Sequence, residues 1–123
     1  MASLNRVTLI GNVGGDPEMR FTPTGDPVTS FGLAVNTKRG EQEDTTWFRI
    51  ITWRKLAEIV NQYVSRGSLV FAEGKLMVKG WENKDGAPRI TLEVQADRVV
   101  FLDRKEQGDA PEAGSTDPGD IPF

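Results

Sequence analysis

Residues 45–53 read TTWFRIITW, and β-branched and aromatic side chains of this kind are typical of a β-strand. Successive side chains of a strand point to opposite faces. One face of this strand therefore carries Trp47, Arg49 and Trp53, while Phe48 points the other way and can fill a core. Burying an unpaired guanidinium costs free energy, which favours exposure of the face with Arg49. The alternative, that both tryptophans pack in the core as most aromatic side chains do, stays open at this point.

After this strand the apolar period changes from two to that of a helix. Apolar side chains recur at helical spacing from Leu56 to Val64, and Arg66 and Gly67 supply a basic last turn and a stop. Four further strands are predicted, at residues 4–13, 28–36, 68–81 and 89–102. The order of elements predicts a mainly β fold, the five-stranded Greek-key barrel of the OB type with one helix between strands 3 and 4. A generic small α+β sheet has the same number of elements.

The pattern also predicts two local features. Gly74 interrupts the fourth strand, which indicates a β-bulge or a bend at this position. Residues 37–44 are polar and charged, and they predict an exposed loop between the second and third strands.

The composition excludes several kinds of site. The 123 residues include no cysteine and no histidine, which removes disulfides, thiolate metal sites, the usual zinc ligands and the usual catalytic triads. No acid–base constellation stands out, so we expect neither an enzyme nor a cofactor or metal site. No apolar run approaches the roughly 20 residues of a membrane span, and the first residues do not resemble a signal peptide.

The charge is distributed unevenly along the chain. The net charge is −3, but residues 106–123 carry five acidic residues and no basic one, whereas residues 1–105 carry 15 basic and 13 acidic residues. A mildly basic body with an acidic tail fits a polyanionic partner better than the net charge suggests. We expect one domain over residues 1–103 and a short disordered acidic tail over residues 104–123, where Gly, Pro, Ala and acids dominate.

All three tryptophans lie between residues 47 and 81, and each has a cation close to it in sequence. In the fourth strand, Lys79 and Trp81 share a face. Aromatic faces stack on unpaired bases of any sequence, and cations follow the phosphates, so this pattern is typical of a sequence-tolerant single-strand binder. A protein-interaction barrel with the tryptophans at a subunit interface is the competing interpretation. The single helix is not basic, which argues against reading a duplex groove.

Several ordered motifs run along the chain. They are Asn5-Arg6-Val7, Gly11-Asn12-Val13-Gly14, Asp16-Pro17-Glu18 with Arg20, Thr46-Trp47-Phe48-Arg49, Lys55-Leu56-Ala57-Glu58, Arg66-Gly67-Ser68, Glu73-Gly74-Lys75-Leu76 and Trp81. With these motifs the chain closely resembles the bacterial single-stranded DNA-binding protein (SSB) family. The resemblance covers roughly residues 3–102 and the last four residues.

The resemblance implies an OB-fold body, usually a homotetramer, that protects single-stranded DNA in replication, recombination and repair in the cytoplasm, at the nucleoid. It implies base stacking by Trp47, Trp53 and Trp81. It implies polar and phosphate contacts by Asn5, Arg6, Arg20, Arg49, Lys55, Arg66 and Lys79. The last residues, Asp120, Ile121, Pro122 and Phe123, look like the family's terminal peptide, which recruits replication and repair proteins.

Three residues depart from the family's pattern. Arg39 stands where the family often carries another stacking tryptophan, Trp53 stands where many members carry Phe, and Arg54 replaces the usual glycine. The same stacking face could serve RNA, because only contacts to the 2′-hydroxyl separate the two nucleic acids. An RNA-binding OB module in translation or RNA chaperoning is therefore the alternative interpretation.

Overall fold

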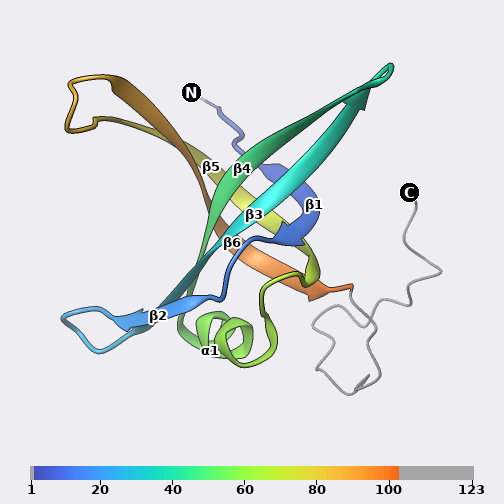
Figure 1. The fold of residues 1–123 in the computed structure, drawn as a ribbon. Helices are drawn as coiled ribbons and strands as arrows, with labels where there is room; N and C mark the ends of the chain where they lie inside the picture. The colour runs from blue at the N-terminus through green and yellow to red at the C-terminus, as the bar shows by residue number, and fades with distance from the viewer. Residues whose placement is uncertain (1, 103–123) are drawn as a thin grey trace.

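The computed structural model describes residues 2–102, which form six strands and one helix. Figure 1 shows how these elements are arranged. The elements are β1 (Val7–Val13), β2 (Glu18–Phe21), β3 (Pro27–Arg39), β4 (Gln42–Trp53), α1 (Arg54–Tyr63), β5 (Leu69–Glu82) and β6 (Pro88–Phe101). The five long strands are the five predicted ones, and the helix follows the third of them as predicted. Among the described residues, no helix has the length and apolar character needed to cross a membrane.

The sheet runs in the order β1-β5-β6-β4-β3-β2, and a second pairing of β1, with β3, closes it into a barrel. β4 and β6 pair in parallel, whereas the other neighbouring strands are antiparallel. The closing contact is tight at Gly11, where an added Cβ would collide with the carbonyl oxygen of Ala34. This closed barrel with one helix confirms the predicted OB-type fold.

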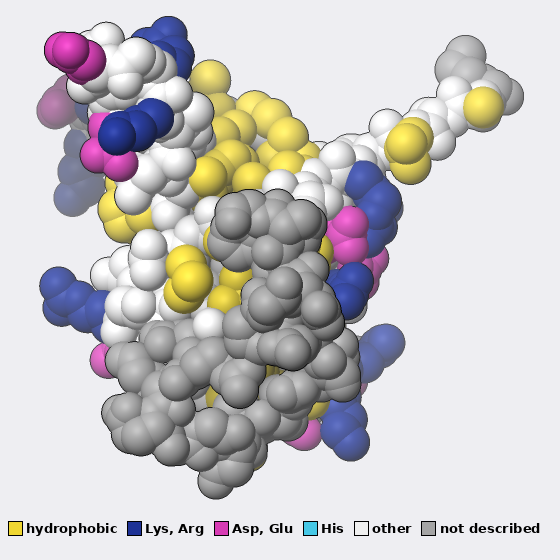
Figure 2. Space-filling model, turned by 90° about the vertical axis from the view of Figure 1, so that its right-hand side faces the viewer, with side chains coloured by type: hydrophobic (Ala, Val, Ile, Leu, Met, Phe, Trp, Pro, Cys, Tyr) yellow, Lys and Arg dark blue, Asp and Glu magenta, His cyan; other side chains and the backbone are white. Residues whose placement is uncertain are grey.

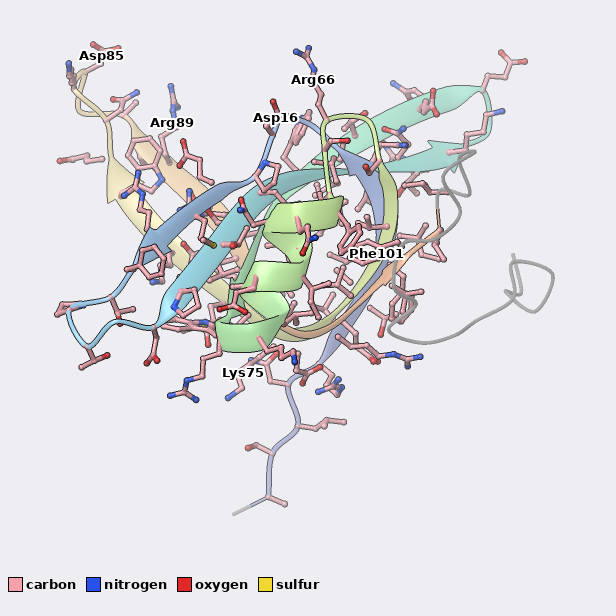
Figure 3. All side chains as sticks on the ribbon, turned by 90° about the horizontal axis from the view of Figure 1, so that it is seen from below. Asp16, Arg66, Lys75, Asp85, Arg89 and Phe101 are labelled. Carbon is pink, nitrogen blue, oxygen red and sulfur yellow. The ribbon has the colours of Figure 1, made fainter. Side chains whose placement is uncertain are left out.

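The helix α1 covers one end of the barrel, as Figures 1 and 3 show. Its apolar side is buried at Ala57 and Val60. One buried hydroxyl holds it in place: Thr29 Oγ1 of β3 donates to the Ala57 carbonyl at 2.7 Å. A second, Thr52 Oγ1 of β4, donates to the Thr29 carbonyl at 2.9 Å and ties β4 to β3 beneath the helix. A buried hydroxyl without a partner would cost about 1–3 kcal/mol. The rest of the core consists of Val13, Phe31, Leu33, Ile50, Val64, Val70, Ala72, Val94, Ala96 and Val99.

The irregularity predicted at Gly74 is confirmed, but the extra residue lies on the neighbouring strand. Glu73 pairs with Arg98 and Gly74 pairs with Ala96, which leaves Asp97 of β6 without a partner in the ladder. Gly74 itself is required by close packing, because an added Cβ would collide with the β6 backbone. The bulge therefore belongs to β6, with glycine making room for it on β5.

Residues 37–44 are exposed as predicted, except for the half-buried Asp44, but the prediction that they form a loop is wrong. β3 and β4 continue as paired strands up to Arg39 and Gln42. A two-residue turn joins them, with Gly40 at a φ of 62°, where glycine is favoured. Near the tip, the Arg39 guanidinium pairs with Asp44 across the strands at 2.9 Å. Polar cross-strand pairs of this kind stabilise a hairpin that has no apolar side chains to bury.

Candidate nucleic-acid interface

The strand pairing places the three tryptophans on one outer face of the barrel. Residues paired across neighbouring strands point to the same side of a sheet. Arg49 of β4 pairs with Glu93 of β6, which in turn pairs with Met77 of β5. We call this surface the tryptophan face. It comprises Trp47, Arg49, Ile51 and Trp53 of β4, Arg89, Thr91, Glu93 and Gln95 of β6, and Lys75, Met77, Lys79 and Trp81 of β5.

The indoles of the tryptophan face are open to solvent. Trp47 is 57% exposed, Trp53 45% and Trp81 51%. On the opposite side of β4, Ile50 is fully buried in the core. The expected exposure of the face that carries Arg49 is therefore confirmed, and the alternative that the tryptophans form part of the core is wrong.

Specific neighbours position two of the indoles. The Trp47 ring lies over Gly14, where a Cβ added to the glycine would come within 2.5 Å of the ring. The same ring also lies close to Gly32, where an added Cβ would be 3.8 Å from it. The Trp81 indole N–H donates to the hydroxyl of Thr91 at 3.0 Å. Because these contacts restrict the rings before any ligand arrives, less conformational entropy is lost when a planar group stacks on them.

Two cations and one carboxylate lie at the centre of the tryptophan face. The Glu93 carboxylate lies 3.9 Å from Arg49 Nε and 3.4 Å from Lys79 Nζ. The Glu93 side chain is only 13% exposed, whereas the side chains of Arg49 and Lys79 are more than half exposed. Both cations therefore keep N–H donors facing solvent, where an anion such as a phosphate can bind.

A cleft of about 510 Å³ opens where β4 and β6 separate. The two strands pair over only three residues each, and beyond this point the β3–β4 and β5–β6 hairpins diverge (Figure 1). The cleft is lined by Trp47 and Arg49, by residues 90–92 and by Asp16 and Glu18, among others. Figure 2 shows hydrophobic side chains (yellow) at the surface, next to the projecting segment at the upper left that carries charges of both signs. This volume is within the range of small-ligand sites.

Asn5 and Arg6 are already bonded within the protein. The Asn5 amide donates to the Leu76 carbonyl at 2.9 Å and accepts from the Leu76 N–H at 3.1 Å, which extends the β1–β5 pairing. The Arg6 guanidinium donates twice to the Asp97 carboxylate, at 3.2 Å each, and lies 3.4 Å from Glu73. The hydrogen bonds to Asp97 raise the pKa of Arg6 above its ordinary value. Both residues lie just before β1, where Asn5 bonds β5 and Arg6 bonds the bulge residue Asp97 of β6.

The remaining predicted contact residues lie around the barrel. Arg20 of β2 pairs with Val28 of β3, which pairs with Trp53 of β4, so Arg20 points to the same side of the sheet as Trp53. The Arg20 side chain is 81% exposed. Lys55 is exposed in the first turn of α1. Arg66 lies in the loop after α1, where its backbone N–H donates to Asp16 at 3.2 Å, and Figure 3 shows its side chain extending away from the barrel. The predicted terminal peptide, Asp120, Ile121, Pro122 and Phe123, lies outside the described residues.

Arg39 and Arg54, two of the unusual residues of this chain, differ in their surroundings. Arg39 is held by Asp44, to which its Nε donates at 3.0 Å. Arg54 has a φ of 58°, in the left-handed region that glycine tolerates best. Its guanidinium lies 3.7 Å from Asp26. Holding a residue with a Cβ in this conformation costs about 1–2 kcal/mol.

The β6 residues of the tryptophan face were not predicted as site residues. Their signal was present, because Arg89, Thr91 and Glu93 alternate with apolar residues along the strand. Alternation separates the two sides of β6 but does not show that β6 lies between β4 and β5. That placement comes from the parallel β4–β6 pairing, which no local pattern encodes.

Residues 4–102 match the model of the single-strand binding protein family. Single-stranded DNA-binding protein A of Bacillus subtilis (strain 168) is 39% identical over 114 residues, covering 90% of this chain and 66% of that protein. The single-stranded DNA-binding protein of Neisseria meningitidis serogroup A is 39% identical over 116 residues, with 89% and 67% covered. A solved structure of the Plasmodium falciparum SSB in complex with ssDNA superposes with a TM-score of 0.72 at 28% identity, covering 84% of this chain and 98% of that one. The chain thus spans about two thirds of the length of these curated relatives.

Proposed function

We infer that this chain, which belongs to the single-strand binding protein family, binds single-stranded DNA without sequence specificity and without catalysing a reaction. The observation that carries the proposal is the tryptophan face, which presents three half-exposed indoles on one surface with two exposed cations between them. Each base that stacks on an aromatic ring contributes about 1–3 kcal/mol, whatever its identity. The names of the relatives and the ssDNA in the Plasmodium falciparum complex support the same ligand.

The geometry supports different contributions from the contact residues. Trp47, Trp53 and Trp81 stack on bases, while Arg49 and Lys79 bind phosphates between them. Arg20 extends the positive surface from β2, and Lys55 and Arg66 add cations at the end of the barrel near α1. For Asn5 and Arg6 the bonds within the protein support a positioning contribution as well, because Asn5 bonds the Leu76 backbone and Arg6 is ion-paired with Asp97 and Glu73.

Fluorescence anisotropy of labelled oligonucleotides tests the proposal. Oligothymidylate, a duplex of the same length and oligouridylate are titrated with the protein at two salt concentrations. We expect tight binding of oligothymidylate, little binding of the duplex, and a salt slope of about −0.7 for each phosphate contacted. Tighter binding of oligouridylate than of oligothymidylate would make RNA the ligand, and equal binding of the duplex would contradict stacking on unpaired bases.

We also propose, from the resemblance of the last four residues, that residues 120–123 recruit replication and repair proteins and that residues 104–123 form a separate acidic tail. Deleting residues 120–123 should leave the affinity for ssDNA unchanged or raise it, because acidic groups compete with phosphates for the cations. A loss of ssDNA binding in this variant would contradict the division between body and tail.

The family resemblance further leads us to propose a homotetramer that acts in DNA replication, recombination and repair at the nucleoid of the cytoplasm. Light scattering of the intact protein gives the mass of the assembly. A mass of four chains supports the proposal, and a monomer at micromolar concentration contradicts it.

A further inference from the structure

Glu93 lies in the middle of the tryptophan face, where phosphate-binding cations would be expected. Its strand, β6, runs between β4 and β5, and its carboxylate lies between Arg49 on one side and Lys79 on the other. Thr91, on the same strand and the same face, bonds the Trp81 indole. A carboxylate surrounded by groups that serve nucleic-acid binding requires an explanation, because it repels the phosphates that these cations attract.

The carboxylate of Glu93 is withdrawn from solvent but weakly bonded. With 13% of its side chain exposed, it is the most buried acid among the ion pairs of the described residues; Glu73, the next, is 24% exposed. Its distances to Arg49 and Lys79, 3.9 and 3.4 Å, are longer than the 2.7–2.9 Å of a charge-assisted hydrogen bond. A carboxylate has about four acceptor positions, so Glu93 keeps the capacity to accept a bond from a ligand.

The sign of the charge decides which part of a strand can lie over Glu93. A phosphate above the carboxylate is repelled, whereas phosphates on either side meet Arg49 and Lys79. The group over Glu93 is then a base, and the carboxylate meets the edge of that base. Carboxylates accept hydrogen bonds from the exocyclic amino group of cytosine, and adenine and guanine offer amino groups as well. Thymine has no amino group, and its N3–H stands between two carbonyl oxygens that repel the carboxylate.

We propose that Glu93 reads base edges on the tryptophan face and shifts the preference of this site toward bases with an exocyclic amino group. This inference rests on the proposed binding of single-stranded DNA. It makes Glu93 a specificity-determining residue within a surface that otherwise binds any sequence, and it explains why the acid stands at the centre of the face rather than at its edge.

Oligodeoxycytidylate and oligodeoxythymidylate of equal length test the inference, because the two pyrimidines have rings of the same size. Affinities are measured at pH 8 by anisotropy for the unaltered protein and for Glu93→Gln. Removing the charge of Glu93 relieves its repulsion of the phosphates of both oligonucleotides equally. Only cytosine, however, loses the charged acceptor for its amino group. We expect the affinity ratio of thymidylate to cytidylate to rise by about fivefold or more, which corresponds to about 1 kcal/mol.

Two further variants complete the experiment. Glu93→Asp keeps the charge but shortens the side chain by one methylene, so the affinity ratio should again rise as the reach to the base edge is lost. Asp97→Asn is the matched control: it removes one negative charge next to Arg6, outside the tryptophan face, and should leave the ratio unchanged. Thermal unfolding of each variant checks that the barrel is intact.

The inference would be overturned if Glu93→Gln raised the affinity for both oligonucleotides equally and Glu93→Asp left the affinity ratio of thymidylate to cytidylate unchanged. Glu93 would then only repel phosphates. Failure of the unaltered protein to bind either oligonucleotide would instead overturn the proposed function.

Discussion

The tryptophan face and the segment just before β1 both carry cations in ion pairs, but the ion pairs differ in distance and in number of partners. On the tryptophan face, Arg49 and Lys79 share one distant carboxylate and stay more than half exposed. Just before β1, Arg6 donates twice to Asp97 and its side chain is 44% exposed, while the Asn5 amide bonds the N–H and the carbonyl of Leu76 on β5. We therefore expect a cation that shares one distant carboxylate to contribute more to phosphate binding than a cation that is bonded closely to two carboxylates.

Removing an indole should have the largest effect. Changing Trp47, Trp53 or Trp81 to Ala should weaken ssDNA binding by about 5- to 150-fold each, because about 1–3 kcal/mol of stacking is lost. Phe21→Ala is the matched control, since Phe21 is 65% exposed but lies on β2, on the side opposite to Arg20. Anisotropy titrations measure both. Equal losses in the tryptophan variants and in Phe21→Ala would remove the distinction between the tryptophan face and other exposed aromatic residues.

Removing a cation should have a smaller effect, and it should show in the salt dependence. Arg49→Ala or Lys79→Ala should weaken binding several-fold and reduce the steepness of the salt slope by about 0.7, the value for one phosphate contact. Arg6→Ala should change the slope less, because the charge of Arg6 is balanced by Asp97 and Glu73. If Arg6→Ala changes the salt slope as much as Arg49→Ala does, the expected difference in phosphate binding between Arg6 and Arg49 is contradicted.

Asn5→Ala should act on stability rather than on binding. It removes both side-chain bonds to the Leu76 backbone, which should lower the free energy of unfolding by about 1 kcal/mol. Urea unfolding followed by circular dichroism measures this loss. A large drop in ssDNA affinity with unchanged stability would instead show that the Asn5 amide contacts the ligand.

Arg54→Gly should have the smallest effect and the opposite sign. Because Arg54 has a φ of 58°, glycine should relieve backbone strain and raise the free energy of unfolding by about 0.5–1 kcal/mol after its own entropy cost. The same urea experiment detects the gain. A decrease in stability would mean that the ion pair of Arg54 with Asp26 outweighs the strain.

Much of the fold and of the site could be predicted from local patterns. The alternation around Trp47 and Arg49 separated the exposed face of β4 from its core face, since period two is a property of the strand itself. The change of period after Trp53 located the helix. These features need only neighbouring residues. The order of elements predicted the OB-type barrel, and the resemblance to a family favoured it over a generic α+β sheet.

The features that sequence reasoning missed depend on distant partners. Residues 37–44 were expected to form a loop because their composition is polar, but Arg39 and Asp44 pair across a hairpin. Glu93 could be assigned to the polar side of its strand, yet its place between two cations follows from the β4–β6 pairing. The orientation of Trp47 likewise depends on Gly14, which lies 33 positions earlier in the chain.

A titration of the intrinsic tryptophan fluorescence with oligothymidylate tests base stacking itself, because the three indoles of the chain are the proposed stacking groups. Stacking should produce strong quenching that saturates with the single strand and little change with a duplex of the same length. Unchanged fluorescence at concentrations where anisotropy shows binding would contradict stacking on the tryptophan face.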